Sequence, residues 1–160
     1  MTTITYRDGR IAGDSQVSSG SVFDCTITKV AQNERGDLAG ASGCIVFSQA
    51  FLAWFSGGEK GETPKCPEDG EAFIVRGSEA GRIECWDSRG YCCVFAPYYA
   101  IGSGKRVALG AMAFGASAAQ AVECAAKHDI YTSGEVTVRS LPGALRQDAL
   151  EERVNPPRVG

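Results

Sequence analysis

The sequence contains a single histidine, His128, among its 160 residues. Catalytic triads of the Ser-His-Asp and Cys-His types use an imidazole as the base. The scarcity of histidine therefore argues against both mechanisms, unless His128 itself serves. We interpret His128 instead as a residue at the C-terminal end of a helix, where its side chain interacts favourably with the helix dipole.

The sequence also lacks an excess of basic charge. Its 16 lysines and arginines are outnumbered by 19 aspartates and glutamates, which gives a net charge of -3. The basic residues are scattered rather than gathered into the stripe that a nucleic-acid backbone requires. We therefore expect no nucleic acid among the partners.

No hydrophobic run is long enough to span a bilayer. The longest, residues 44–55, is interrupted by Ser48 and Gln49 and falls short of the roughly 20 residues that a transmembrane helix needs. Arg7 and Asp8 lie where a signal peptide would have an apolar segment. We expect no membrane association and a cytoplasmic location.

Paired C-x-x-C motifs are missing as well. The seven cysteines are an odd number, and Cys85, Cys92 and Cys93 do not have the spacing of a zinc site. With no export signal, we expect the thiols to be reduced.

The length is sufficient for one domain with its own hydrophobic core. We assign residues 1–140 to this domain. Residues 141–160 include Pro142, Pro156 and Pro157, which indicates an extended C-terminal tail.

Strand-forming patterns begin at the N-terminus. Residues 2–6 are rich in β-branched and aromatic side chains, Asp8-Gly9 is a strong hairpin signal, and residues 11–14 resume an extended pattern. By the same criteria we expect further strands at residues 22–30, 38–43, 72–76, 82–86, 91–95 and 134–139.

Three segments have the character of helices. Residues 44–55 are apolar on nearly all sides, which indicates burial on both faces, between layers of the protein or against another subunit. Residues 105–114 and about 117–127 follow, the last opened by the capping-box pair Ser117 and Gln120. Residues 57–70 are the clearest loop. The order of elements predicts an α+β fold with four layers, two antiparallel sheets with helices on their outer faces.

Thr2 is the first candidate for chemistry. If Met1 is removed, Thr2 carries both a hydroxyl nucleophile and a free amine that can act as its base. Such an amine has a pKa of about 8, and a buried ammonium nearby would lower this pKa. Lys29, the one basic residue of the strand predicted at residues 22–30, is the candidate cation. Asp14 could hold it through a charge-assisted hydrogen bond.

Glycine-rich segments supply further candidate groups. Residues 38–43 form a bend whose backbone N–H groups could stabilise an oxyanion. Ser103 lies between two glycines just before a predicted helix, and residues 128–134 place a carboxylate and hydroxyls after another.

Together these pieces resemble proteasome β subunits, and most closely the bacterial HslV-type peptidase, within the N-terminal nucleophile hydrolases. The matching segments follow the order of that family at nearly its spacing, and they are Thr2-Thr3-Ile4, residues 9–15, Lys29, Leu38-Ala39-Gly40, residues 100–104 and residues 129–132. The resemblance implies the four-layer αββα fold of that class and a threonine-type peptidase that hydrolyses peptides or unfolded proteins.

The resemblance also implies roles for individual residues. Thr2 would be the nucleophile, Lys29 the cation that lowers the pKa of its amine, and Asp14 the residue that orients Lys29. The remaining catalytic candidates are Gly40, as oxyanion donor, and Ser103, Asp129 and Thr132, as supports for Thr2.

A pocket for an apolar or small residue before the scissile bond would be lined by Val17, Ile27, Ala31, Leu38 and Ser42. HslV-type enzymes hold a monovalent cation by backbone carbonyls, which implicates Ala126, Asp129 and Thr132. No other cofactor is expected.

One departure from the family leaves alternatives open. The loop at residues 57–70 replaces a second long helix, and in the family that helix contributes to ring packing and to docking of a chaperone. A homo-oligomeric ring or related assembly and an ATP-dependent unfoldase partner are implied only by the resemblance. The alternative functions are an inactive assembly module and an amidohydrolase that acts on a non-protein amide.

Overall fold

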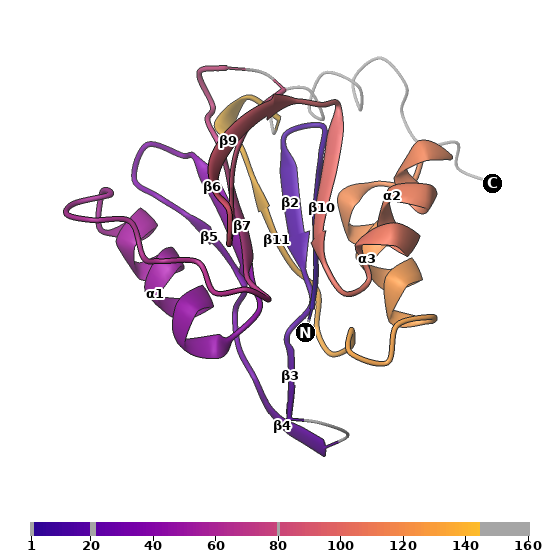
Figure 1. Ribbon diagram of the computed structural model, residues 1–160. Coiled ribbons are helices and arrows are strands. Elements are labelled where there is room, and N and C mark those ends of the chain that lie inside the picture. The colour runs from indigo at the N-terminus through magenta and orange to yellow at the C-terminus, as the bar shows by residue number, and fades with distance from the viewer. Residues whose placement is uncertain (1, 20–21, 80, 145–160) are drawn as a thin grey trace, which may run out of the picture.

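The structure is a computed structural model that describes residues 2–19, 22–79 and 81–144. It has the expected α+β class, with antiparallel sheets (Figure 1). The strands are β1 (Thr3–Arg7), β2 (Arg10–Gly13), β3 (Gln16–Ser19), β4 (Val22–Thr26), β5 (Val30–Gln32), β6 (Leu38–Ser42), β7 (Glu71–Val75), β8 (Arg82–Asp87), β9 (Gly90–Phe95), β10 (Tyr98–Gly102) and β11 (Thr137–Ser140). The helices are α1 (Ile45–Ser56), α2 (Lys105–Ala113) and α3 (Ala118–Ala126).

The strands form two main sheets and a small ribbon. One sheet has the order β10-β1-β2-β11, the other has the order β5-β6-β7-β8-β9, and β3 pairs only with β4. The first hairpin turns at Asp8 and Gly9, which have φ angles of 50° and 74°. This left-handed pair matches the twist of antiparallel strands, so the hairpin predicted from Asp8-Gly9 is confirmed.

The main core lies between the two large sheets. Ile4, Tyr6 and Ile11 of the four-stranded sheet pack against Phe73 and Val75 of the five-stranded sheet. Alternate residues of a strand point to opposite faces, so Thr5 faces the other way. Its hydroxyl donates a hydrogen bond to the carbonyl of Ala118 at the start of α3, at 2.8 Å.

The helices cover the outer faces of the sheets, α1 on one side of the molecule and α2 with α3 on the other (Figure 1). The side of α1 that packs on the five-stranded sheet is formed by Phe47, Phe51, Leu52 and Phe55. Ile45 and Val46 remain exposed, so within this chain α1 buries one face rather than both. In the described part of the chain, no helix combines the length and the apolar character needed to cross a membrane.

Helix limits follow local signals closely. The predicted capping box is confirmed, since the Ser117 hydroxyl accepts the Gln120 N–H at 3.2 Å and the Gln120 side chain accepts the Ser117 N–H at 2.9 Å.

The tail expected from residue 141 begins in contact with the domain, because the Leu141 N–H donates to the Gly9 carbonyl at 2.8 Å. Residues 145–160 of that predicted tail lie outside the described residues.

Three strand predictions need correction. The strand expected at residues 22–30 is two strands, because the chain changes partners from β3 to β6 between β4 and β5. Lys29 lies in this break rather than within a strand. The prediction missed β3 and also missed β10, whose pairing with β1 joins residues almost 100 positions apart in the sequence.

Phe51 is the clearest test of the packing of α1. It is fully buried, with ring centroids 5.9 Å from Phe47, 5.5 Å from Trp54 and 5.2 Å from Trp86. Replacement of a buried Phe by Ala costs about 3–5 kcal/mol, so Phe51→Ala should lower the free energy of unfolding in urea by that amount. The control Phe114→Ala removes a ring that is 97% exposed and should change it by less than about 0.5 kcal/mol. Equal losses would contradict this account of the core.

Candidate functional site

Thr2 and Asp14 lie together at the end of the first hairpin. The register of β1 and β2 pairs Ile4 with Gly13, and the Asp14 N–H donates to the Thr3 carbonyl at 3.2 Å. The Thr2 hydroxyl donates to Oδ1 of Asp14, and the Thr3 N–H donates to the same oxygen at 2.9 Å. Thr2 is 2% exposed. Two residues that are twelve positions apart are thus joined by a short hairpin.

Lys29 completes this group from the break between β4 and β5. Its Nζ lies 3.0 Å from Oδ2 of Asp14, and the two side chains are only 5% and 1% exposed. Burial lowers the pKa of the Lys29 ammonium below its ordinary value, although the negative charge of Asp14 opposes this shift. Removal of one partner of a buried ion pair leaves the other charge uncompensated, so Asp14 and Lys29 depend on each other.

A second hydrogen-bonded cluster supports the N-terminal segment from the side of α3. The Ser103 hydroxyl lies 3.2 Å from the Thr2 carbonyl oxygen and 2.6 Å from Oδ2 of Asp129. The Thr132 hydroxyl donates to the same Asp129 oxygen at 2.6 Å and lies 2.6 Å from the Thr3 hydroxyl. This cluster fixes the backbone on both sides of the bond between Thr2 and Thr3.

Two glycines allow this close approach. A Cβ atom on Gly102, which has a φ of 93°, would lie 2.1 Å from the Thr2 carbonyl oxygen. A Cβ atom on Gly104 would lie 2.1 Å from the Thr3 hydroxyl oxygen. Because neither distance is sterically possible, glycine on both sides of Ser103 lets the β10-to-α2 turn contact the start of β1.

A cavity of about 450 Å³ opens beside Thr2 and Lys29. Three of the five pocket residues expected from the sequence, Val17, Ile27 and Ser42, line it. The prediction was wrong for the other two. Ala31 packs against the aromatic cluster under α1, and Leu38 lies in the core between the sheets.

Gly40 is also separated from the cavity. A Cβ atom at this position would lie 2.7 Å from Ile4 Cγ2 and 3.2 Å from Ile11 Cδ1, which places Gly40 in the core between the sheets. Gly43 lines the cavity instead and has a φ of 101°. The role of Gly40 as oxyanion donor stays a prediction, since the sequence alone does not tell which glycine of residues 38–43 faces the core.

Several cavity residues were missed. Gln16, Ser18, Ala41, Cys44, Ile45, Ser48, Asp69 and Tyr131 also line it. A signal for Ile45 and Ser48 was present, since the first turn of a helix must lie beside the bend that precedes it. No local signal pointed to Asp69, which comes from the loop at residues 57–70.

The predicted monovalent-cation site maps to one short segment. Ala126 is the last residue of α3, and Asp129 and Thr132 belong to the turn that follows. The Asp129 carbonyl accepts the Thr132 N–H at 3.0 Å, so one of the three proposed carbonyl ligands already has a hydrogen bond. Among residues 2–19, 22–79 and 81–144, no cluster of three or more His, Cys, Asp or Glu residues could hold a metal ion. A site built from carbonyls stays a prediction.

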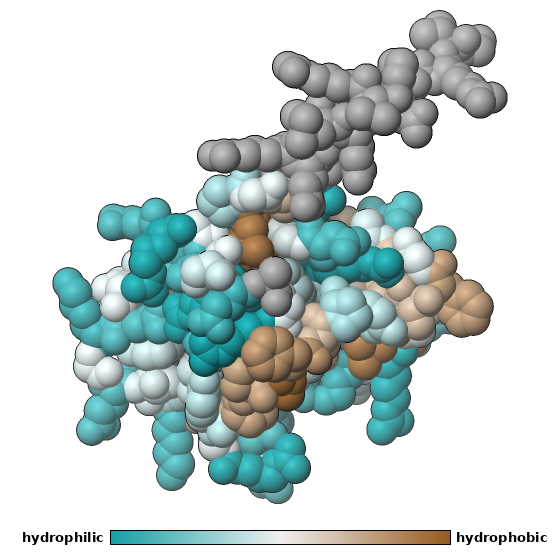
Figure 2. All heavy atoms as spheres, turned by 90° about the horizontal axis from the view of Figure 1, so that it is seen from above, coloured by the Kyte–Doolittle hydropathy of each residue, from teal (hydrophilic) through white to brown (hydrophobic). Residues whose placement is uncertain are grey.

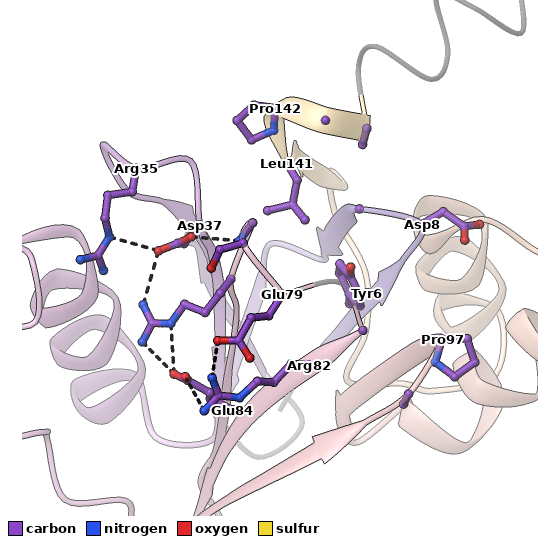
Figure 3. Close-up of a pocket in the computed structure, with 18 of the residues that line it drawn as sticks. Tyr6, Asp8, Arg35, Asp37, Glu79, Arg82, Glu84, Pro97, Leu141 and Pro142 are labelled. Carbon is purple, nitrogen blue, oxygen red and sulfur yellow. Dashed lines mark hydrogen bonds and ion pairs between the residues drawn. The ribbon is translucent and has the colours of Figure 1, made fainter.

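A larger cavity of about 1010 Å³ lies at the other end of β1, around Tyr6, Asp8 and Gly9 (Figure 3). Seen from this end, the molecule shows a group of hydrophilic side chains beside smaller hydrophobic areas (Figure 2). Although it is the larger of the two, this cavity is remote from the Thr2 group.

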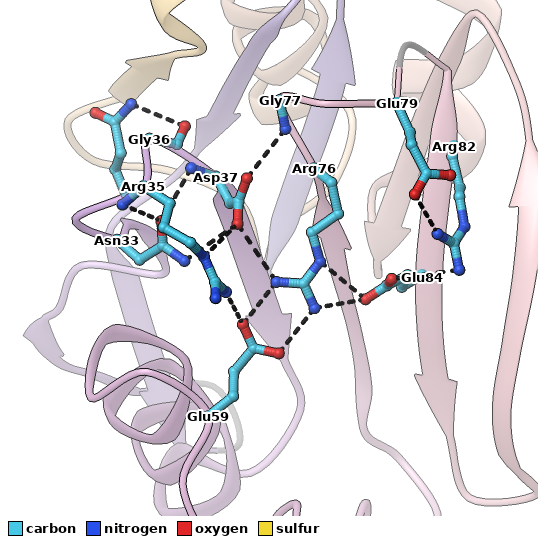
Figure 4. A network of polar contacts seen from close by, with 11 residues as sticks. Asn33, Arg35, Gly36, Asp37, Glu59, Arg76, Gly77, Glu79, Arg82 and Glu84 are labelled. Carbon is cyan, nitrogen blue, oxygen red and sulfur yellow. Dashed lines mark hydrogen bonds and ion pairs between the residues drawn. The ribbon is translucent and has the colours of Figure 1, made fainter.

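The charges around the larger cavity pair with one another (Figure 4). Arg76 lies 2.6 Å from Glu59, 2.7 Å from Glu84 and 3.5 Å from Asp37. Hydrogen bonds from Arg76 hold the pKa of Glu59 below its usual range. We interpret this network as a structural link between the loop after α1 and the strands β7 and β8.

Comparison with solved structures finds chains of similar fold. Thiobacillus denitrificans BPH superimposes with a TM-score of 0.62 at 19% sequence identity, over 88% of this chain and 97% of that one. This chain is similar to BPH in fold. The structure of Thiobacillus denitrificans BPH in complex with Epoxomicin gives the same TM-score and identity and is covered to 98%. No protein-family model matches the chain, and no curated protein matches it either. At this level of identity the likeness to BPH establishes the fold alone.

The buried pair of Asp14 and Lys29 gives a stability prediction. Asp14→Asn removes the counter-charge of a buried ammonium and should lower the free energy of unfolding by about 3–5 kcal/mol. The double variant Asp14→Asn with Lys29→Met should recover part of this loss, because no charge is then left unpaired. As a control, Asp8→Asn breaks a pair with Arg7 in which the Asp8 side chain is 71% exposed, and it should cost less than about 1 kcal/mol. Urea denaturation measures these free energies of unfolding. Similar losses for Asp8→Asn and Asp14→Asn would contradict the role of the buried pair.

The lowered pKa of Lys29 gives a pH dependence. Between this lowered pKa and the ordinary value of 10.5, the unfolded chain binds more protons at Lys29 than the folded one. Stability then rises with pH. The free energy of unfolding of the wild type minus that of Lys29→Met should therefore increase as the pH rises toward 10.5. Denaturation in urea at several alkaline pH values measures this difference, and a flat or falling curve would exclude the shift.

Proposed function

We propose that this chain is a threonine-type peptidase with the four-layer αββα fold of N-terminal nucleophile hydrolases. One observation carries the proposal. The hydroxyl of Thr2 donates to a buried carboxylate that also binds a buried ammonium, and the three groups lie beside a cavity of about 450 Å³. The similarity in fold to BPH over nearly its whole length supports the proposal at the level of architecture.

The proposed reaction begins with removal of Met1, which frees the Thr2 amine. The amine takes the proton of the Thr2 hydroxyl while Oγ1 attacks the carbonyl carbon of a peptide bond. The C–N bond breaks, the proton passes to the leaving amine, and an ester joins the substrate to Thr2. Water then cleaves the ester, which gives a carboxylic acid and restores the hydroxyl.

The neighbouring residues have distinct roles in this proposal. The Lys29 ammonium lowers the pKa of the Thr2 amine, so that more of it is neutral at pH 7. Asp14 holds Lys29 and orients the Thr2 hydroxyl through its two carboxylate oxygens. Ser103 fixes the Thr2 carbonyl from the other side.

Gly43 replaces Gly40 as the proposed oxyanion donor. A fixed backbone N–H stabilises a developing negative charge without any reorganisation. Gly43 suits this role better because it lines the cavity at the end of β6, whereas the position of Gly40 is enclosed by Ile4, Ile11 and Phe73.

We propose peptides or unfolded proteins as substrates and a homo-oligomeric ring or related assembly as the working form. Delivery of substrate by an ATP-dependent unfoldase and a cytoplasmic location stay predictions. Because one of the similar structures is that of BPH in complex with Epoxomicin, we propose the same compound as a ligand for the Thr2 site.

Replacement of the nucleophile tests the function directly. In protein shown by mass spectrometry to lack Met1, Thr2→Ala should reduce cleavage of fluorogenic peptides by at least about a thousandfold, since the hydroxyl that forms the ester is absent. The control Thr63→Ala changes an exposed threonine of the loop at residues 57–70 and should leave the rate unchanged. Undiminished cleavage by Thr2→Ala would exclude the proposed mechanism.

A further inference from the structure

The cavity beside Thr2 carries an unbalanced negative charge. Of the residues that line it, only Lys29 and Asp69 are charged at neutral pH. Lys29 is neutralised by Asp14 at 3.0 Å. Asp69 is exposed, and its carboxylate makes no hydrogen bond or ion pair with any residue in the described ranges. A ligand in this cavity therefore meets one carboxylate that has no cation of the protein beside it.

The loop at residues 57–70 holds Asp69 in place. The Gly70 N–H donates to the Pro67 carbonyl at 3.0 Å, which closes a turn around Asp69. A Cβ atom on Gly43 would lie 2.8 Å from the Asp69 carbonyl oxygen, so the loop packs directly against the bend that lines the cavity. Asp69 is thus next to the proposed oxyanion donor.

The thiol of Cys66 lies in the same negative field. Its pKa is raised to about 11, first by burial and then by the charges of Asp87, Glu71 and Asp69. Of these three carboxylates, Asp87 pairs with Arg89 and Glu71 pairs with Lys105. Asp69 is therefore the one that adds an unbalanced negative charge, which disfavours an anionic ligand beside it.

Part of the cavity wall is apolar. Val17, Ile27, Ala41 and Ile45 contribute hydrocarbon surface to it. Lysine and arginine side chains combine an apolar stem with a charged end, so they can pack along such a wall while the charge stays at an exposed rim. A cavity that offers both apolar surface and a carboxylate therefore suits a lysine or arginine side chain better than it suits a purely apolar side chain.

We infer that the preferred substrate is a peptide with a lysine or arginine next to the scissile bond, selected by Asp69. This inference rests on the proposed peptidase function. It replaces the apolar or small residue that the family resemblance implied, and it assigns a role in specificity to the loop that stands where the family has a second helix.

Pairs of internally quenched peptides that differ only in having lysine or norleucine test the inference. In one pair this residue comes before the scissile bond, and in the other pair it comes after the bond. Wild-type kcat/KM should be about fivefold higher for the lysine peptide, as expected for one partly exposed ion pair. Salt at about 1 M should remove most of this preference, because it shortens the Debye length to about 3 Å.

Asp69→Asn should abolish the preference while the norleucine peptide is still cleaved, which shows in the same assay that the variant is folded. The matched control is Glu68→Gln, which neutralises an exposed carboxylate of the same loop that does not line the cavity, and it should keep the preference. Equal cleavage of both peptides by the wild type, or a preference that survives in Asp69→Asn, would overturn the inference and leave the peptidase function intact. Absence of any Thr2-dependent cleavage of either peptide would overturn the proposed function, and this inference with it.

Discussion

The buried carboxylate of Asp14 is the interaction on which the rest of the structure depends. It is 1% exposed and accepts hydrogen bonds from the Thr2 hydroxyl, the Thr3 N–H and the Lys29 ammonium. A buried carboxylate without such partners would be costly. The first hairpin and the break before β5 must therefore both be in place before the site exists, which couples folding of the two sheets to formation of the proposed nucleophile group.

The two ends of the sheet pair differ in how their charges are balanced. Around Arg76 each charge faces an opposite one, and the network fixes a loop to two strands. Beside Thr2 the buried pair of Lys29 and Asp14 is balanced, but Asp69 at the cavity has no cationic partner among the described residues. The contrast is physically meaningful because a balanced network contributes to structure, whereas an unpaired charge at a cavity is available to a ligand.

Local signals in the sequence predicted much of the fold and part of the site. The Asp8-Gly9 turn and the capping box of α3 depend on residues close in sequence, and both are confirmed. The grouping of Thr2, Asp14 and Lys29 was an expectation supported by the family resemblance, and the structure brings the three residues together. The errors at Ala31 and Leu38 and the unforeseen position of Gly40 in the core share one cause. Which face a strand residue presents depends on the pairing of β5, β6 and β7, and that pairing joins segments far apart in the sequence. Asp69 was missed because its position depends on how a long loop packs against Gly43.

The central claim is that Thr2 becomes a reactive N-terminal nucleophile. Mass spectrometry of the purified full chain, intact and after digestion, before and after treatment with an epoxyketone electrophile, tests this claim most directly. We predict an untreated mass that lacks Met1 and, after treatment, a single adduct on the peptide that begins at Thr2. An intact Met1 on active protein, or an adduct found only on a cysteine while Thr2 stays unmodified, would contradict the account.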